Sequence, residues 1–136
     1  MKDASYTVSY NLPANWRNII LSKWMRSLRF GNDYYKLMDK DAYYGAYHPY
    51  IEKIINDPES CIKFATLSED EDVVLGFSVS RDNVLHYVHV HKDVRKQGIG
   101  RSLVPDGIEV ITHLTKNGLV IWSNKCPRWK FNPFAF

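Results

Sequence analysis

The sequence predicts an α/β protein whose central sheet is mixed, mostly antiparallel and flanked by helices. Apolar residues recur at helical spacing over residues 16–30 and 41–55, and then alternate as in a strand over 61–67. A last helical pattern over 99–116 leads into a short apolar run at 119–122. A helix that connects two strands of one sheet leaves them parallel, so both strand directions are expected.

The expected order of elements is strand, two helices, three strands, helix, strand. A β-rich run at 5–11 forms the first strand, and residues 73–80 and 84–91 follow 61–67 as strands. The turns between these three strands are short, which predicts an antiparallel meander. Pro105 lies inside the last predicted helix and should bend it, and Gly118 suits the position just after its end.

Composition and charge indicate one ordinary globular domain, residues 1–136. Apolar residues make up 45% of the chain and charged residues 24%, with a net charge of +3. A dedicated nucleic-acid binder would show a denser stripe of Lys and Arg, so nucleic acid is an unlikely partner. Cys61 and Cys126 form no metal-binding pattern, and no signal peptide or membrane span is visible. We therefore expect a cytoplasmic protein with reduced thiols.

A strand followed by a basic, glycine-rich turn and a helix is the most informative feature. Helix N-termini offer unpaired backbone N–H groups and attract anions. Gly98 and Gly100 let a phosphate approach the backbone closely, and Arg95, Lys96 and Arg101 add positive charge. The turn lacks the spacing of a P-loop and of the dinucleotide fingerprint. It predicts a cradle for a pyrophosphate.

This segment resembles motif A of the GNAT acetyltransferases, Arg/Gln-x-x-Gly-x-Gly/Ala after a strand. Arg95-Lys96-Gln97-Gly98-Ile99-Gly100 agrees at every fixed position, and the order of elements agrees as well. The resemblance implies the acyl-CoA N-acyltransferase fold, acetyl-CoA as cosubstrate and no metal. It also implies transfer of an acetyl group to a primary amine of a small molecule or protein, by direct attack in a ternary complex.

The resemblance also implies which residues bind coenzyme A. Backbone amides of residues 96–101 would hold the pyrophosphate, and the backbone of 88–90 would pair with the pantetheine arm as a pseudo-strand. The fourth and fifth strands would splay there, with the acetyl group between 88–90 and 121–123. The implied cofactor-binding residues are Val88, His89, Val90, Arg95, Lys96, Gln97, Gly98, Ile99, Gly100 and Arg101.

Amine acetylation needs a group that removes a proton from the nitrogen, and histidine suits this task near neutral pH. The strand 84–91 carries His86, His89 and His91. Strict alternation places His89 and His91 on one face and His86 on the other, unless a bulge intervenes. One branch of the resembled family has a proton-relaying histidine at the offset of His86, which implies His86 as the catalytic base, directly or through water. The alternative is a half-buried His86 hydrogen-bonded to a neighbour.

Two departures from the family pattern stand out. No tyrosine follows Tyr87, so the usual general acid for the leaving thiolate is missing, and Ser123 and Cys126 are the nearest substitutes. A thiol pKa of about 8.5 makes thiolate a tolerable leaving group. The final helix and strands of the family are missing or reduced to 127–136. This aromatic, basic tail is expected to cover the sheet edge or to pack on a second copy, which leaves a homodimer open.

The acceptor amine is expected against residues 30–50. Tyrosines are dense there and carboxylates lie in the same stretch, and together they can bind a cation. The residues are Tyr34, Tyr35, Tyr43, Tyr44, Tyr47 and Tyr50, with Asp33, Asp39 and Asp41. The alternative is an aromatic helix face with solvated charges.

Two other functions stay open. The missing tyrosine and short C-terminus favour an acyl-CoA-binding module without catalysis. The basic, aromatic tail supports a nucleic-acid-directed modifying member, because such side chains can stack on bases.

Overall fold

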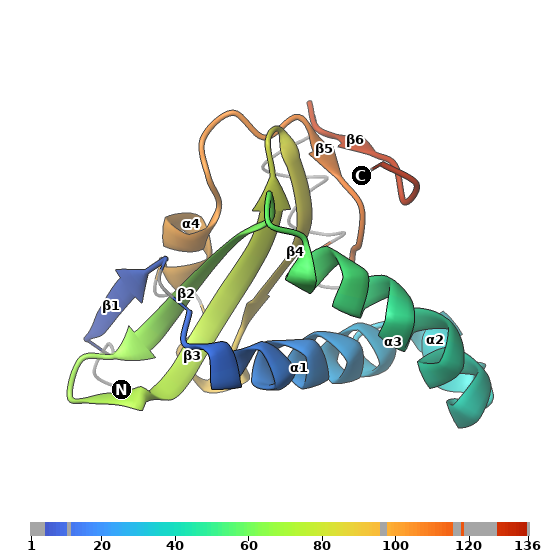
Figure 1. Ribbon diagram of the computed structural model, residues 1–136, viewed down its shortest axis with the longest axis horizontal. Helices are drawn as coiled ribbons and strands as arrows, with labels where there is room; N and C mark the ends of the chain where they lie inside the picture. Colours follow the sequence, from blue (N-terminus) through green and yellow to red (C-terminus); the bar gives the residue numbers. More distant parts are fainter. Residues whose placement is uncertain (1–4, 11, 96–97, 116–117, 119–127, 136) are drawn as a thin grey trace.

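A six-stranded sheet forms the centre of the protein (Figure 1). The computed structural model describes residues 5–10, 12–95, 98–115, 118 and 128–135. The strands, which lie in the sheet in chain order, are β1 (Tyr6–Ser9), β2 (Cys61–Leu67), β3 (Asp70–Arg81), β4 (Val84–Val90), β5 (Val110–Ile111) and β6 (Lys130–Phe131). The pairs from β1 to β4 are antiparallel, whereas β5 runs parallel to β4 and β6 parallel to β5. The predicted mixed sheet is confirmed.

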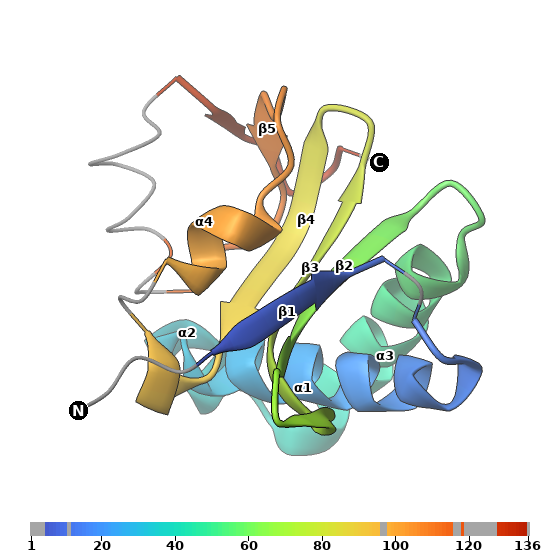
Figure 2. The ribbon, with the colours of Figure 1, turned by 90° about the vertical axis from the view of Figure 1, so that its left-hand side faces the viewer.

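Helices cover both faces of this sheet (Figure 2). They are α1 (Arg17–Phe30), α2 (Asp33–Leu37), α3 (Lys40–Asn56) and α4 (Ile99–Leu103). Helices α1 and α3 pack on one face and α4 on the other, because their buried residues belong to different apolar clusters. The two predicted N-terminal helices are confirmed to within one residue at each end.

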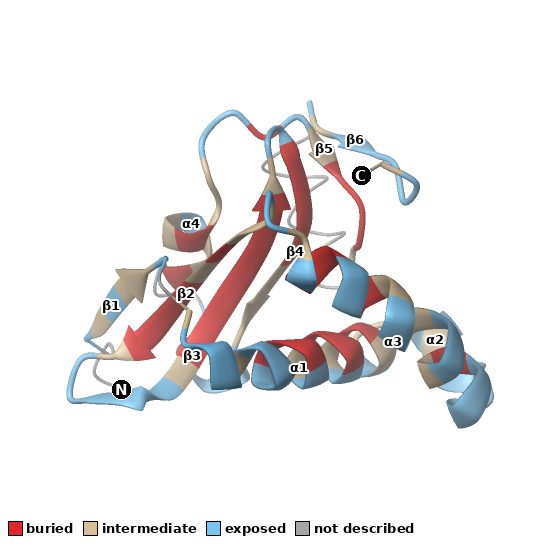
Figure 3. Cartoon of the chain, viewed as in Figure 1, coloured by how far each residue is buried: buried red, intermediate tan, exposed pale blue. Residues whose placement is uncertain are grey.

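The larger cluster lies between α1, α3 and the middle of the sheet (Figure 3). The helical spacing of Ile20, Trp24 and Leu28 places all three side chains inside it. The Trp24 ring stacks on Tyr87 of β4, with centroids 5.2 Å apart and planes 2° from parallel. The Tyr87 hydroxyl lies 2.7 Å from the Ser27 hydroxyl, so β4 is held to α1 by both ring and hydroxyl.

The predicted helix over 99–116 is wrong, because α4 ends at Leu103. Val104 is extended, with φ −80° and ψ 120°, as expected of a residue before proline. Pro105 is followed by a turn in which Gly107 has φ 80°, and the chain then enters β5. Pro-Asp-Gly is a turn signal, and it outweighs the helical spacing on either side.

The prediction that Gly118 follows a helix end is also wrong. Gly118 is itself helical, and its N–H donates to Thr115 Oγ1 over 3.0 Å. The strand predicted at 119–122 lies outside the described residues. The strand that the α4 crossover reaches is β5.

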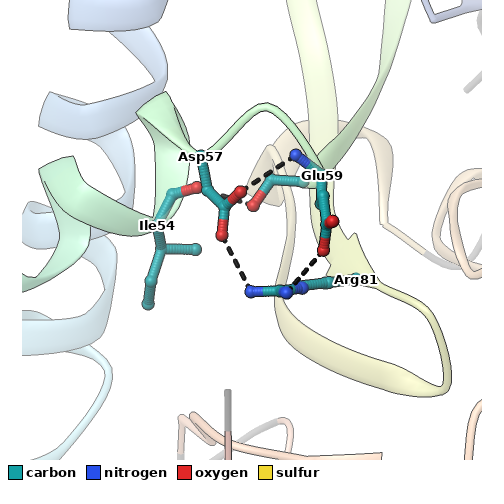
Figure 4. Close-up of polar contacts among 5 residues, drawn as sticks. Ile54, Asp57, Glu59 and Arg81 are labelled. Atoms are coloured by element: carbon teal, nitrogen blue, oxygen red, sulfur yellow. Dashed lines mark hydrogen bonds and ion pairs between the residues drawn. The ribbon is translucent and has the colours of Figure 1, made fainter.

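Arg81, at the end of β3, ties the loop after α3 to the sheet (Figure 4). Its Nη1 lies 2.9 Å from Asp57 Oδ2, and its Nη2 lies 2.5 Å from Glu59 Oε2. Asp57 Oδ1 also accepts the Glu59 N–H at 2.9 Å. The Ser60 hydroxyl donates to the Ile54 carbonyl at 2.6 Å. These bonds fix the end of α3 against the sheet.

The tail pairs with the sheet as β6 and so extends its edge beyond β5. Tyr50 on α3 donates its hydroxyl to the Pro133 carbonyl at 3.3 Å. Within the described residues, the expectation that the tail covers the sheet edge is confirmed.

Candidate functional site

The pairing between strands β4 and β5 is short. They pair at two positions, Val84 with Val110 and Leu85 with Ile111. Strand β4 runs on, and residues 88–90 pair with β3 on its other side. The expected splay between 88–90 and 121–123 stays a prediction, because the strand paired with β4 in the described residues is Val110–Ile111. Residues 121–123, expected to form its other side, lie outside the described residues.

Two glycines at the start of α4 leave space beside the backbone. Gly98 caps α4 with φ 84° and ψ 0°, a conformation that favours glycine. A Cβ added at Gly98 would meet no atom within 4 Å, and one at Gly100 would meet Val90 Cγ2 at 3.6 Å. The first N–H groups of α4 have no acceptor within the helix. Lys96 and Gln97 lie outside the described residues.

Positive charge lies beside this turn. Arg95 and Arg101 are exposed, and Arg95 Nε donates to the Val90 carbonyl at 3.0 Å. That carbonyl was expected to pair with pantetheine, so Arg95 competes for it. The exposed His91 lies 3.6 Å from the Asp93 carboxylate and accepts the Asp93 N–H.

His86 lies at a bulge of β4. Val79 pairs with Tyr87 and Ser80 with Leu85, which leaves His86 as the extra residue and confirms that strict alternation fails here. The side chain is buried, with 1% of the residue's surface exposed. Burial is the main cause that lowers the pKa of His86 to about 4. The positive charge of Arg81 lowers this pKa further, and the negative charge of Asp57 opposes the shift.

His113 is a second buried histidine beside His86. Thr112 Oγ1 lies 3.1 Å from His86 Nδ1 and 2.7 Å from His113 Nδ1, and it donates to the His86 carbonyl at 3.2 Å. The hydroxyl has one hydrogen, so both ring nitrogens that contact its oxygen must donate to it. In this tautomer Nε2 of each ring is the acceptor.

Burial, followed by the charge of His86, lowers the pKa of His113 to about 4. Its ring stands edge-on to Trp24 with centroids 5.4 Å apart. Sequence reasoning missed His113 because it was expected inside a helix. The Pro-Asp-Gly turn was the signal that could have placed it after a new strand.

The His89 ring packs against a different neighbour. Its centroid lies 5.7 Å from that of Phe77, a residue of the larger apolar cluster. Burial, followed by the charges of Arg95 and Lys23, lowers the pKa of His89 to about 4.

A groove of about 690 Å³ opens between the helices α1 to α3, the segment after β5 and the tail. Its lining residues are Leu28, Asn32, Tyr34, Tyr35, Ala46, Tyr47, Tyr50, Thr112, His113, Leu114, Thr115, Phe131, Pro133 and Phe134. Four of the six tyrosines expected at the acceptor site line it. Tyr43 does not, because it is buried and donates to the Met25 carbonyl at 2.7 Å.

The three carboxylates expected at the acceptor site are not among the lining residues. Asp39 caps α3 by accepting the Ala42 N–H at 3.0 Å. Asp33 lies 3.6 Å from Lys36 Nζ, and Asp41 is exposed. Four of the tyrosines predicted for the acceptor site therefore line the groove, whereas the three predicted carboxylates do not.

In the described part of the chain, no three His, Cys, Asp or Glu side chains gather as a metal site. The same part contains no helix with both the length and the apolar character that a bilayer crossing requires.

Comparison with solved structures identifies the fold. An aminoglycoside acetyltransferase from an uncultured soil metagenomic sample matches with a TM-score of 0.53 and 14% identity, over 96% of this chain and 93% of that chain. YjaB from Escherichia coli matches with a TM-score of 0.51 and 17% identity, over 73% of this chain and 61% of YjaB. No protein-family profile and no curated protein sequence matches the chain. The chain has the GNAT acyltransferase fold, which confirms the fold class predicted from the sequence.

Proposed function

We propose that the protein is an acetyl-CoA-dependent N-acetyltransferase that acts on a primary amine in a ternary complex. The observation that carries this proposal is that β4 pairs with β5 at only two positions and continues beyond them toward the glycine turn. An open, basic glycine turn lies at the end of β4, and the groove begins where residues 112–115 leave β5. A thioester held in the splay would therefore connect a phosphate site with an acceptor site.

Coenzyme A would lie along β4. In the proposal, the backbone from Lys96 and Gln97 to Arg101 holds the pyrophosphate, with Arg95 and Arg101 adding charge. The pantetheine arm pairs with the backbone of Val88 and His89. Since Arg95 already occupies the Val90 carbonyl, the arm pairs there only if Arg95 swings toward the phosphates.

The acceptor nitrogen attacks the thioester carbonyl, the carbon–sulfur bond breaks, and coenzyme A leaves as a thiolate that takes a proton from water. The nitrogen loses a proton, and His86 remains the proposed final acceptor. His86 is buried and its Nδ1 donates to Thr112, so in this proposal the proton reaches His86 at Nε2, directly or through water. Burial lowers the pKa of both His86 and His113 to about 4, so both rings are neutral at pH 7.

A pair of substitutions at Gly98 tests the phosphate site. Asn and Asp have similar shapes and both tolerate positive φ, so Gly98→Asn measures the backbone effect and Gly98→Asp adds a negative charge. Two phosphate charges near 4 Å each oppose that charge by about 1 kcal/mol in water. Gly98→Asp should therefore bind acetyl-CoA about thirtyfold more weakly than Gly98→Asn in isothermal titration. Equal affinities of the two variants would remove the phosphate site from this turn.

One observation favours an acyl-CoA-binding module without catalysis, namely that no tyrosine follows Tyr87. Thiol release from acetyl-CoA across a panel of primary amines separates the two functions. Release above the amine-free rate supports the transferase, and binding without release supports the module.

A further inference from the structure

The groove offers few unused polar atoms. The Tyr35 and Tyr47 hydroxyls lie 2.7 Å apart and bond to each other. The Tyr50 hydroxyl donates to the Pro133 carbonyl, and the Asn32 amide donates to two backbone carbonyls. A ligand with many hydroxyl or amino groups would find few unengaged partners among these atoms, and a buried polar group left unmatched is costly.

The groove is also uncharged. Among the described residues that line it there is no Asp, Glu, Lys or Arg. A polycation desolvated there would find no carboxylate partner, and burying an unpaired charge is strongly unfavourable. Charge complementarity therefore favours an acceptor with a single amino group.

Aromatic rings from two distant parts of the chain stand exposed at the groove. Tyr34 of α2 is 75% exposed, Phe131 of β6 is 49% exposed and Phe134 of the tail is 85% exposed. Exposed rings gathered around one groove are typical of a binding surface for an apolar ligand. The volume of about 690 Å³ suits a small molecule.

His113 supplies a polar point in this apolar groove. It lines the wall formed by the segment after β5, where its Nδ1 is held by Thr112. With Nδ1 donating, Nε2 is the ring nitrogen that can accept a hydrogen bond. An amine N–H is a suitable donor for it.

We propose that the groove holds a primary amine carried on an aromatic or apolar body, with the amine nitrogen directed to His113. The inference rests on the proposed function, because it assumes that the groove is the acceptor site of the transferase. It goes beyond that function by naming the class of acceptor.

The test measures amine binding directly, with and without coenzyme A. The probes are 2-phenylethylamine and hexylamine, against spermidine, in ligand-observed NMR titrations. The single amines should bind at least tenfold more tightly than spermidine. Phe134→Ala should weaken 2-phenylethylamine binding about three- to tenfold, as expected for a lost aromatic contact.

Leu37→Ala is the matched control, because Leu37 is 87% exposed and lies outside the groove lining. Both side chains are exposed, so neither substitution threatens the fold. Leu37→Ala should leave the affinity for 2-phenylethylamine unchanged.

Several outcomes overturn the inference. Spermidine binding as tightly as 2-phenylethylamine is one, and an unchanged affinity in Phe134→Ala is another. If acetyl-CoA binds but no single amine binds at millimolar concentration, the inference fails while the proposed function stands. If the amines bind through Phe134 but acetyl-CoA does not bind, the groove chemistry stands and the proposed function fails.

Discussion

Replacing Gly76 by alanine should loosen the strand end from which the glycine turn starts. Gly76 of β3 pairs with Val90 of β4. A Cβ at Gly76 would lie 2.6 Å from the His89 carbonyl oxygen and 3.3 Å from Val90 Cα. Both are backbone atoms, so the strand itself must move. Overpacking of this kind costs about 1–3 kcal/mol.

Gly45→Ala is the control, because its expected effect on stability is opposite to that of Gly76→Ala. Gly45 lies inside α3, is exposed, and a Cβ there would meet nothing within 4 Å. Alanine is favoured over glycine in a helix by about 0.5–1 kcal/mol, so this substitution should stabilise the protein.

The assay is urea unfolding followed by tryptophan fluorescence, with acetyl-CoA titration of the folded variants. Gly76→Ala should lower the unfolding midpoint and weaken acetyl-CoA binding, whereas Gly45→Ala should raise the midpoint and leave binding unchanged. If Gly76→Ala were as stable as the wild type, β3 and β4 would not approach each other as closely as described, and the reasoning about this strand end would be refuted.

Two further predictions concern buried polar groups. The pKa values of His86, His89 and His113 lie near 4 in the folded chain, against an ordinary value of 6.5 for histidine. Above pH 6.5 neither the folded nor the unfolded chain binds these protons. As the pH falls from 6.5 to 4 the unfolded chain takes them up first, so stability is lost in this window. His113→Gln should reduce that slope by up to about 1.4 kcal/mol per pH unit, measured by urea unfolding at several pH values, and an unchanged slope would contradict the burial of His113. Tyr43→Phe removes the hydroxyl bond to the Met25 carbonyl and should cost about 1 kcal/mol, whereas Tyr34→Phe at an exposed position should cost little. Equal effects of the two substitutions in thermal unfolding would argue against the Tyr43 bond.

The predictions that held depend on short-range patterns. The helical spacing of Ile20, Trp24 and Leu28 and the alternation in β2 belong to single elements, so the residues themselves specify which side is buried. The open space at Gly98 is a local property as well, because glycine has no Cβ.

The predictions that failed depend on competition between local signals. Over residues 99–116, apolar spacing favoured a helix and Pro-Asp-Gly favoured a turn. The helical segment has five residues, and so short a helix has little intrinsic stability. The later part of this segment forms strand β5 instead of a helix. There Ile108 and Ile111 pack against Leu85 of β4.

The sequence by itself determined the glycine turn, the order of the first elements and the resemblance to the GNAT fold. The packing of the folded chain was needed to establish that His86 is buried and bonded to Thr112, that His113 lies in the groove, and that the nearby carboxylates do not. The physical reason is that burial and charge pairing depend on neighbours far away in the chain: Thr112 lies 26 residues from His86. No local pattern records such a contact.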